Sequence, residues 1–227
     1  MIELLAVTKS YKQGERIVEA VRGITLSIQA GEFVSIMGPS GSGKSTLMHL
    51  IGALDVPTGG QARFRGEDLE RLTDDQRSHL RRQRIGFVFQ AFNLMPTLTA
   101  AENVALPLML GGTPRTAALA RAMTQLERVG LAARGAHFPN ELSGGEMQRV
   151  AIARAVVTEA DAVLCDEPTG NLDSATSQEI LSLLAGLPNE KRAVVMVTHD
   201  ASAAAYGTRI VRLRDGLLES DTAVSSS

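Results

Sequence analysis

The chain has 227 residues, of which 44% are hydrophobic and 21% are charged, and its formal net charge is −2. This length and composition are typical of a globular protein with one substantial domain and a buried core. The nearly balanced charge argues against the broad basic surface of nucleic-acid-binding proteins, so we expect no nucleic acid among the partners.

The N-terminal residues, 1–16, lack the charged region and the long apolar stretch of a secretory signal. No apolar run reaches the roughly 18 to 20 residues that are needed to cross a bilayer. We therefore expect a cytoplasmic protein. The single cysteine, Cys165, lies within an apolar run and is interpreted as a small buried residue without chemistry.

Short apolar runs rich in β-branched residues alternate with longer helical patterns along the chain. This alternation predicts an α/β domain with a largely parallel sheet. The clearest expected strands are Phe33–Met37, Ile85–Phe89, Ala162–Cys165 and Ala193–Val197.

Capping residues indicate where three helices begin. A capping box pairs a serine or threonine with a glutamate or glutamine three residues later, and proline is favoured at the first helical position. The signals are Thr73 with Gln76, Thr99 with Glu102, and Pro114 after Thr113.

Residues 91–157 lack a convincing strand and are predicted to be mostly helical. We interpret them as a helical subdomain that is inserted into the sheet domain, which would then consist of residues 1–90 and 158–227. The last seven residues, DTAVSSS, are expected to form a disordered polar tail.

Residues 38–46, GPSGSGKST, match the phosphate-binding pattern GxxxxGK[ST] between an expected strand and a helical pattern. Glycines let backbone N–H groups approach phosphate oxygens, and the following helix contributes its positive end. Lys44 is expected to reach the β- and γ-phosphates, and Ser45 to offer its hydroxyl to Mg²⁺. A glycine-rich turn without a ligand is the alternative. The expected phosphate-binding residues are Gly38, Pro39, Ser40, Gly41, Ser42, Gly43, Lys44, Ser45 and Thr46.

Residues 142–149, LSGGEMQR, form a second expected anion site, in which Ser143 and two glycines, Gly144 and Gly145, open a helix. Ser143 and Glu146 also have the spacing of a capping box, so the segment can serve as a plain helix cap. The two glycines favour the approach of a phosphate, and both roles can hold together.

Asp166 and Glu167 follow the apolar run 162–165 at the carboxyl end of an expected strand. Parallel α/β sheets bind their ligands at this edge. Asp166 is predicted to hold Mg²⁺ through its water shell, and Glu167 is predicted to be the general base that polarises the attacking water. A helix cap or a surface pair of acids is the alternative.

His199 follows the expected strand 193–197. A histidine at this position can donate a hydrogen bond to a γ-phosphate oxygen and orient the attacking water, so His199 is predicted to be catalytic. The other histidines, His49, His79 and His137, lack such a setting and are interpreted as packing or surface residues.

The segment 142–149 closely resembles the signature motif of ATP-binding-cassette (ABC) ATPases, and the resemblance extends from Val7 to about Leu218. It implies a RecA-like P-loop core, an inserted helical signature subdomain, an N-terminal antiparallel β portion, and ATP and Mg²⁺ as cofactors. It also implies that Tyr11 stacks on adenine and that Gln90 senses Mg²⁺ and the transport partner.

The same resemblance implies a homodimer, because in this family the signature of one subunit completes the phosphate site of the other. Asp173 would then lie in a loop that crosses the dimer interface, and Ser143, Gly144, Gly145 and Glu146 would face the partner's ATP. Glu146 stands where many members have glutamine, and Met147 replaces another frequent glutamine. Neither change removes a phosphate-binding group.

Residues 87–108 and 166–176 resemble the branch of lipoprotein-releasing, macrolide-exporting, haem-exporting and cell-division ATPases. This implies an ATPase subunit that sits on the inner face of the cytoplasmic membrane and drives an integral membrane permease for export or extraction of a lipoprotein, drug, haem or peptide. We expect the permease to bind apolar residues beside Gln90: Phe92, Leu94, Met95 and Leu98.

Three other functions remain open. A cell-division ATPase would regulate a periplasmic hydrolase through a membrane partner. A soluble cassette protein without a permease would carry tandem cassettes or long insertions, which this chain lacks. A small-molecule kinase would explain the phosphate loop but not the signature segment.

Overall fold

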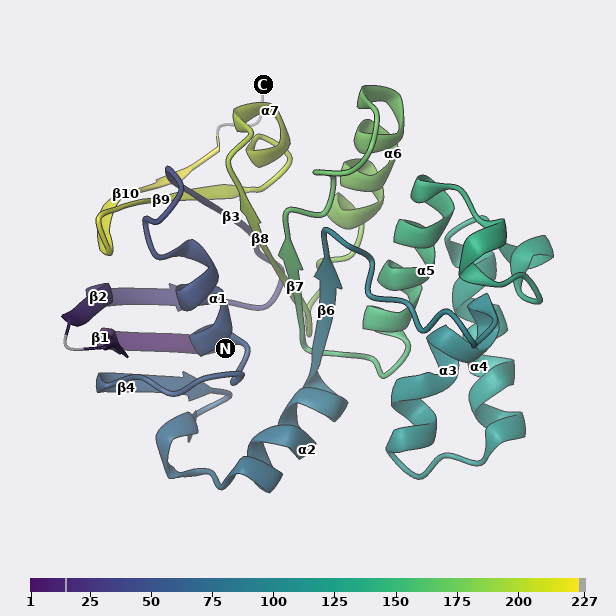
Figure 1. Cartoon of the computed structure of the whole chain (residues 1–227), viewed down its shortest axis with the longest axis horizontal. Helices are drawn as coiled ribbons and strands as arrows, with labels where there is room; N and C mark the ends of the chain where they lie inside the picture. Colours follow the sequence, from purple (N-terminus) through teal and green to yellow (C-terminus); the bar gives the residue numbers. More distant parts are fainter. Residues whose placement is uncertain (15, 225–227) are drawn as a thin grey trace. The chain divides into compact units, whose positions relative to one another are not determined.

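The computed structural model describes residues 1–14 and 16–224, which form two compact units (Figure 1). The first unit comprises Met1–Arg81 and Pro188–Ser227, and the second comprises Arg82–Leu187. Helix α2 (Asp74–Arg84) contains the boundary between them.

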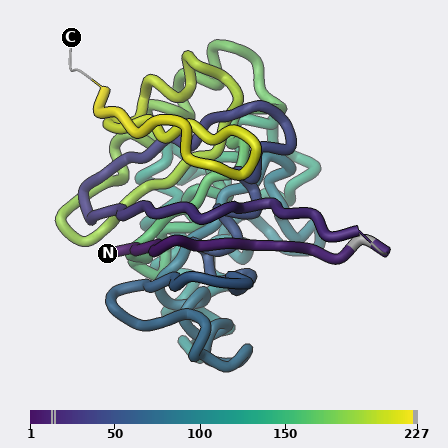
Figure 2. The backbone as a smooth tube through the Cα atoms, turned by 90° about the vertical axis from the view of Figure 1, so that its left-hand side faces the viewer, coloured from purple at the N-terminus to yellow at the C-terminus, as the bar shows by residue number. Residues whose placement is uncertain are grey.

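The first unit has an antiparallel sheet made from the N-terminal part of the chain, in which β1 and β2 lie side by side (Figure 2). The strand order is β2-β1-β4-β5, and every neighbouring pair is antiparallel. This confirms the antiparallel N-terminal portion that the resemblance implies. The strands are β1 (Ile2–Gln13), β2 (Arg16–Ile28), β4 (Gly59–Phe64) and β5 (Glu67–Asp68).

Strand β1 follows the period of two that is expected for a half-buried strand. Ile2 and Leu4 are buried and alternate with more exposed neighbours. The pairing with β2 shifts between Leu4 and Val7, which returns Val7 to the buried side. Ile2, Leu4 and Val7 therefore belong to the core of the first unit, whereas Leu5 is exposed.

A second sheet of the first unit contains the predicted parallel strands. Strand β3 (Phe33–Met37) pairs in parallel with both β8 (Ala193–Thr198) and β9 (Arg209–Arg214). Every residue of β3 and β8 is buried, as is typical of parallel strands that are covered on both faces. The unit's helices are α1 (Lys44–Ile51), the 3₁₀ turn η1 (Leu69–Arg71) and α7 (Ala201–Ala204).

The prediction of a disordered tail is wrong for residues 221–223, which belong to β10 (Leu217–Ala223). This strand pairs antiparallel with β9, and Asp221 forms an ion pair of 2.6 Å with Arg209. An edge strand needs backbone hydrogen bonds on one side only, so polar side chains do not prevent it. Residues 225–227 lie outside the described part of the chain.

The second unit contains one parallel strand pair and four helices. Strand β6 (Ile85–Phe89) pairs with β7 (Ala162–Asp166), and helix α5 packs closely on β6. A Cβ added to Gly86 would lie 2.1 Å from the carbonyl oxygen of Ala155, so only glycine allows this approach. The helices are α3 (Ala100–Leu110), α4 (Arg115–Arg128), α5 (Gly144–Val156) and α6 (Ser174–Ala185), with 3₁₀ turns η2 (Ala132–Arg134) and η3 (Pro139–Glu141).

The expected α/β fold, with its parallel strands and its helical segment, is confirmed. Helices α3, α4 and α5 enclose an apolar core that includes Val104, Leu126 and Val150. The exact limits of the helical subdomain, residues 91–157, stay a prediction.

The predicted capping boxes are present at Thr73 with Gln76 and at Thr99 with Glu102. The prediction for Pro114 is wrong by one position, since Pro114 is the N-cap of α4 rather than its first helical residue. Its ψ of 140° is extended, so the helix begins one residue later.

Asn103 fixes the loop that precedes α3. Its buried amide nitrogen donates to the carbonyl oxygens of Met95, Leu98 and Thr99 at 3.0–3.1 Å, and its oxygen accepts the N–H of Met95 at 2.7 Å. A buried amide with all these partners holds the loop backbone in one conformation.

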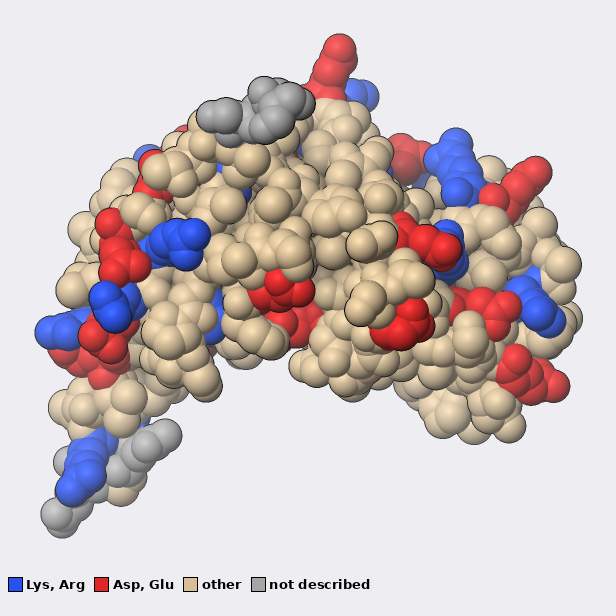
Figure 3. Space-filling model, turned by 90° about the horizontal axis from the view of Figure 1, so that it is seen from above, with Lys and Arg blue, Asp and Glu red and all other residues tan. Residues whose placement is uncertain are grey.

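Acidic and basic side chains are interspersed on the face shown in Figure 3. This distribution agrees with the nearly balanced charge of the chain. Within residues 1–14 and 16–224, no helix has both the length and the apolar character needed to cross a membrane.

Candidate functional site

The loop of residues 38–46 has the properties of a phosphate site. Helix α1 begins at Lys44 without a side-chain cap, so its first N–H groups face the loop with no side-chain acceptor. The ammonium of Lys44, which is 9% exposed, donates to the carbonyl oxygens of Gly38 and Pro39 at 2.8 Å. The hydroxyl of Ser42 is buried and has no hydrogen-bond partner among the described residues. These groups suit a polyphosphate, which supplies many acceptor oxygens.

Two glycines let this loop pass close to neighbouring backbone. A Cβ on Gly38 would lie 2.3 Å from the carbonyl oxygen of Leu213, and a Cβ on Gly43 would lie 2.3 Å from that of Ala20. Gly43 also has a φ of 96°, which favours glycine. The loop conformation therefore depends on its sequence.

The sheet register places His199 at the same edge as the phosphate loop. Met37 and Thr198 are paired residues at the ends of the parallel strands β3 and β8, and the loop and His199 follow them directly. His199 is exposed and lies beside Asp200, whose carboxylate accepts the N–H and hydroxyl of Ser202 and caps α7. Hydrogen bonds from Ser202, more than the nearby His199, lower the pKa of Asp200.

Tyr11 lies on β1 of the first unit, with its ring half-buried. Its hydroxyl donates to Asp55 at 3.0 Å, and the ammonium of Lys9 lies 5.1 Å from the ring centroid. Lys9 also forms an ion pair of 2.6 Å with Asp55. Burial, followed by the bond to Asp55, raises the pKa of Tyr11. The ring is therefore held in one orientation.

A matching register in the second unit places Gln90 beside the acidic pair. Phe89 pairs with Asp166 at the ends of β6 and β7, and Gln90 and Glu167 are the next residues. Gln90 donates through Nε2 to Asn171 at 3.1 Å, and Asn171 donates to the carbonyl oxygen of Gln90 at 3.0 Å.

Glu167 has a backbone φ of 47°, in the left-handed region that non-glycine residues rarely occupy. Such a conformation costs on the order of 1–3 kcal/mol and is concentrated at functional sites. The catalytic role of Glu167 stays a prediction. No group of three or more His, Cys, Asp or Glu side chains suited to a metal ion occurs within residues 1–14 and 16–224.

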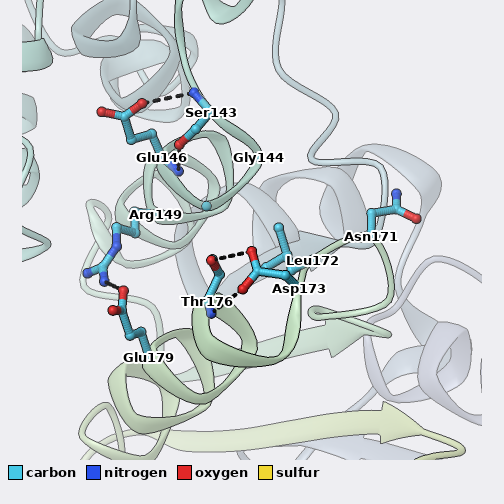
Figure 4. Close-up of a pocket in the computed structure, with 10 residues that line it drawn as sticks. Ser143, Gly144, Glu146, Arg149, Asn171, Leu172, Asp173, Thr176 and Glu179 are labelled. Atoms are coloured by element: carbon cyan, nitrogen blue, oxygen red, sulfur yellow. Dashed lines mark hydrogen bonds and ion pairs between the residues drawn. The ribbon is translucent and has the colours of Figure 1, made fainter.

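The signature residues line a cavity of about 320 Å³ in the second unit (Figure 4). Ser143 caps α5, since its hydroxyl accepts the N–H of Glu146 at 3.2 Å and its own N–H donates to Glu146 at 2.8 Å. The capping role is therefore confirmed, and the phosphate role stays a prediction. The lining residues are Ser143, Gly144, Gly145, Glu146, Arg149, Asn171, Leu172, Asp173, Thr176 and Glu179.

Asp173 enters this cavity as the N-cap of α6. Its carboxylate accepts the N–H of Thr176 at 3.0 Å and the hydroxyl of Thr176 at 2.6 Å. These bonds lower the pKa of Asp173, so the side chain is ionised at neutral pH. The structure thus brings Asp173 together with the signature residues of the same chain, and its place in a loop that crosses the dimer interface stays a prediction.

Two contacts of α5 were not found by sequence reasoning. Gln148 is completely buried and donates to the carbonyl oxygens of Pro168 and Phe89, which lie next to the acidic pair and to Gln90. Arg154 donates to the carbonyl oxygens of Phe92 and Asn93 at 2.8 and 2.5 Å. No local pattern singles out Gln148, because α5 also carries other polar residues, namely Glu146, Arg149 and Arg154.

Two interpretations of single residues can be compared with the structure. Cys165 is buried, and burial raises the pKa of its thiol, which agrees with a residue that has no chemistry. His137 was expected to have a packing or surface role, and it is half-buried with its Nε2 3.2 Å from the guanidinium of Arg134. His79 is exposed and His49 is half-buried, as expected.

Comparisons with known proteins show which family the sequence matches. The sequence profile described as "ABC transporter" matches residues 21–170. The chain is 49% identical over 219 residues to an uncharacterized ABC transporter ATP-binding protein of Thermotoga maritima, covering 96% of this chain and 94% of that protein.

Longer relatives also match nearly the whole chain. It is 47% identical over 222 residues to the macrolide export ATP-binding/permease protein MacB of Aggregatibacter actinomycetemcomitans and 48% identical over 226 residues to the pyoverdine export ATP-binding/permease protein PvdT of Pseudomonas fluorescens, covering 98% and 99% of this chain. The chain spans about a third of these two relatives, 34% of each.

A solved structure has the same fold. The dimeric, post-hydrolysis state of the ATP-binding cassette MJ0796, bound to ADP and Pi, matches with a TM-score of 0.90 and 46% identity over 100% of both chains.

Proposed function

This chain belongs to the ABC transporter family, and we propose that two copies close around two ATP molecules and drive a membrane permease. The chain is an ABC ATPase. The observation that carries the proposed dimer is the presence of two different candidate phosphate sites on one chain, the loop 38–46 and the signature cavity. A two-fold symmetric pair can combine them into two identical composite sites.

Within each composite site, the first chain supplies the positive charge and the catalytic groups. Lys44 binds the β- and γ-phosphates, Glu167 accepts a proton from the attacking water, and His199 donates to a γ-phosphate oxygen. Ser45, Gln90 and Asp166 offer the oxygen ligands that Mg²⁺ prefers, and the ion neutralises phosphate charge when it is bound. The second chain supplies Ser143 and the N–H groups of Gly144 and Gly145.

A shared site makes activity depend on chain concentration. At saturating ATP, the hydrolysis rate per chain should rise with chain concentration, because the dimer forms by mass action. The rate should level off once nearly all chains are dimeric. The measurement is ATPase activity over about a hundredfold range of chain concentration, with light scattering on the same samples. A constant rate per chain where light scattering reports monomers would contradict the shared site.

The permease is proposed from the names of the relatives and from the surface beside Gln90. MacB and PvdT carry export and permease names, which supports export rather than the cell-division alternative. Met95 is 48% exposed next to the loop that Asn103 fixes, and we propose it as a contact for the permease. Leu94 packs against the helical core, so it is a poorer candidate. Through the permease, the ATPase would be associated with a membrane.

Replacing Tyr11 tests how the nucleotide base is held. Stacking of an aromatic ring on a base is worth about 1–3 kcal/mol, so Tyr11→Ala should weaken ATP binding by about tenfold. Tyr11→Phe keeps the ring and removes only the hydroxyl bond to Asp55, so it should bind ATP nearly as well as the unmodified chain.

The measurement is ATP affinity by calorimetry for the three proteins. If Tyr11→Phe binds as weakly as Tyr11→Ala, the hydroxyl and Asp55 hold the nucleotide site together and stacking is the wrong explanation.

A further inference from the structure

The signature cavity carries an unusual charge for a phosphate site. Three of its lining residues are acidic: Glu146, Asp173 and Glu179. A carboxylate near a bound phosphate repels it, so such a site needs each carboxylate to be neutralised or bonded. Asp173 is used as the cap of α6, and Glu179 is paired with Arg149 at 2.8 Å. Glu146 is the remaining acid, and it lies in the first turn of α5 itself.

Both oxygens of Glu146 have partners. One accepts the N–H of Ser143 at 2.8 Å, and the other accepts the Nε of Arg134 at 2.9 Å. The bond from Ser143, with further help from Arg134, lowers the pKa of Glu146. Glu146 is therefore a carboxylate at neutral pH, and its charge is directed at Arg134.

Arg134 is itself held on its other side. Its Nη1 lies 3.2 Å from the Nε2 of His137. A guanidinium can only donate, so the Nε2 of His137 is the acceptor in this contact. The contacts between His137, Arg134, Glu146 and Ser143 thus connect η2 and the residues that follow it to the N-cap of the signature helix.

We propose that Arg134 is a positioning residue for ATP, which neutralises and orients Glu146 so that the amino end of α5 attracts the partner's phosphate. The inference rests on the proposed function, in which the signature cavity receives the γ-phosphate of a second chain. It also explains how this chain carries an acidic side chain at a phosphate site. A half-exposed ion pair contributes little to the stability of the fold. The main effect of Arg134 is therefore on the electrostatic potential at the phosphate site.

A second arginine–glutamate pair in the same unit resembles the pair of Arg134 and Glu146. It serves as a control that separates the proposed effect on the phosphate from simple helix capping. Glu102 forms the same capping box with Thr99 on α3, and Arg115 donates to it at 2.7 Å, but neither residue lines the signature cavity. Arg115→Gln removes the same kind of ion pair and the same charge as Arg134→Gln. Only Arg134→Gln should weaken ATP-driven dimerisation.

The experiment measures ATP-driven dimerisation by light scattering, with Glu167→Gln present in every chain to slow hydrolysis. Arg134→Gln should raise the ATP concentration for half-maximal dimer by about tenfold. Glu146→Gln keeps the capping box, because glutamine also accepts the Ser143 N–H. In the Glu146→Gln background, Arg134→Gln should change the midpoint by less than about twofold. Arg115→Gln should behave like its parent.

Two results would overturn the inference. In the first, Arg134→Gln weakens dimerisation by the same factor in the background that keeps Glu146 and in the Glu146→Gln background. In the second, Arg134→Gln has no effect on dimerisation in either background. Either result would show that Arg134 does not act on the ligand through the Glu146 charge.

A second measurement does not need the dimer. The amide signals of Gly144 and Gly145 are followed by NMR during titration of each isolated variant with inorganic phosphate. Arg134→Gln should weaken phosphate binding only when Glu146 is present. If the parent does not dimerise with ATP but this pattern is seen, the shared site is wrong and the Arg134 inference stands. If the parent dimerises with ATP and this pattern is absent, the inference about Arg134 is wrong and the shared site still holds.

Discussion

We expect Glu167→Gln to lower ATP hydrolysis by about two to four orders of magnitude while ATP still binds, because glutamine cannot accept the proton of the attacking water. Glutamine keeps the size of the side chain and accepts the same unusual backbone conformation about as well as glutamate. Glycine would be a poorer test, since it would also relieve the left-handed φ at this position.

The same variant should accumulate as a dimer. Unhydrolysed ATP binds the closed pair more tightly than the separate chains, so adding ATP shifts the equilibrium towards the dimer. Size-exclusion chromatography with light scattering should show a shift from monomer to dimer with ATP and no shift with ADP. Glu127→Gln, an exposed position on α4, is the control and should hydrolyse ATP normally. Normal hydrolysis by Glu167→Gln would remove it as the base, and a variant that stays monomeric at saturating ATP would count against the shared site.

Lys44→Ala should reduce turnover by at least about a hundredfold, because a preorganised cation at the developing phosphate charge is lost. Its ammonium is already placed inside the loop, where it donates to two loop carbonyl oxygens. The alanine variant loses these two bonds as well as the ligand contact. Steady-state ATPase assays measure the effect, and thermal unfolding shows whether the loop has been disrupted.

Lys12→Ala is the matched control for Lys44, since Lys12 is an exposed lysine of the same unit. It should retain full activity. Unchanged activity of a folded Lys44→Ala protein would show that the loop 38–46 does not hold the reacting phosphates.

The elements with strong local signals could be predicted from the sequence. Strands β3 and β8 are continuous apolar runs, and the structure buries every one of their residues. The capping boxes at Thr73, Thr99 and Ser143 were also visible, because their partners lie only three residues away. Patterns that depend on neighbours in sequence are therefore reliable here.

Apart from the one-residue error at Pro114, the errors and omissions concern contacts between distant residues. The antiparallel pairing of β1 and β2 followed only from the family resemblance, because β2 is mostly exposed and has a weak apolar pattern. Strand β10 was missed because its polar residues gave no sign of the ion pair between Asp221 and Arg209. The ion pair between Arg134 and Glu146 joins η2 to the first turn of α5, and no local pattern predicts it.

The contacts of Arg154 have a consequence for local unfolding. Phe92 and Asn93 both have left-handed φ values, 60° and 50°, and their carbonyl oxygens are held by this one partly buried guanidinium from α5. Two consecutive residues in that conformation do not persist without such support. The segment after Gln90 therefore cannot fray independently, because its opening breaks charge-assisted bonds to the helix. Its backbone amides should exchange hydrogen together with those of α5, as parts of a single cooperative folding unit.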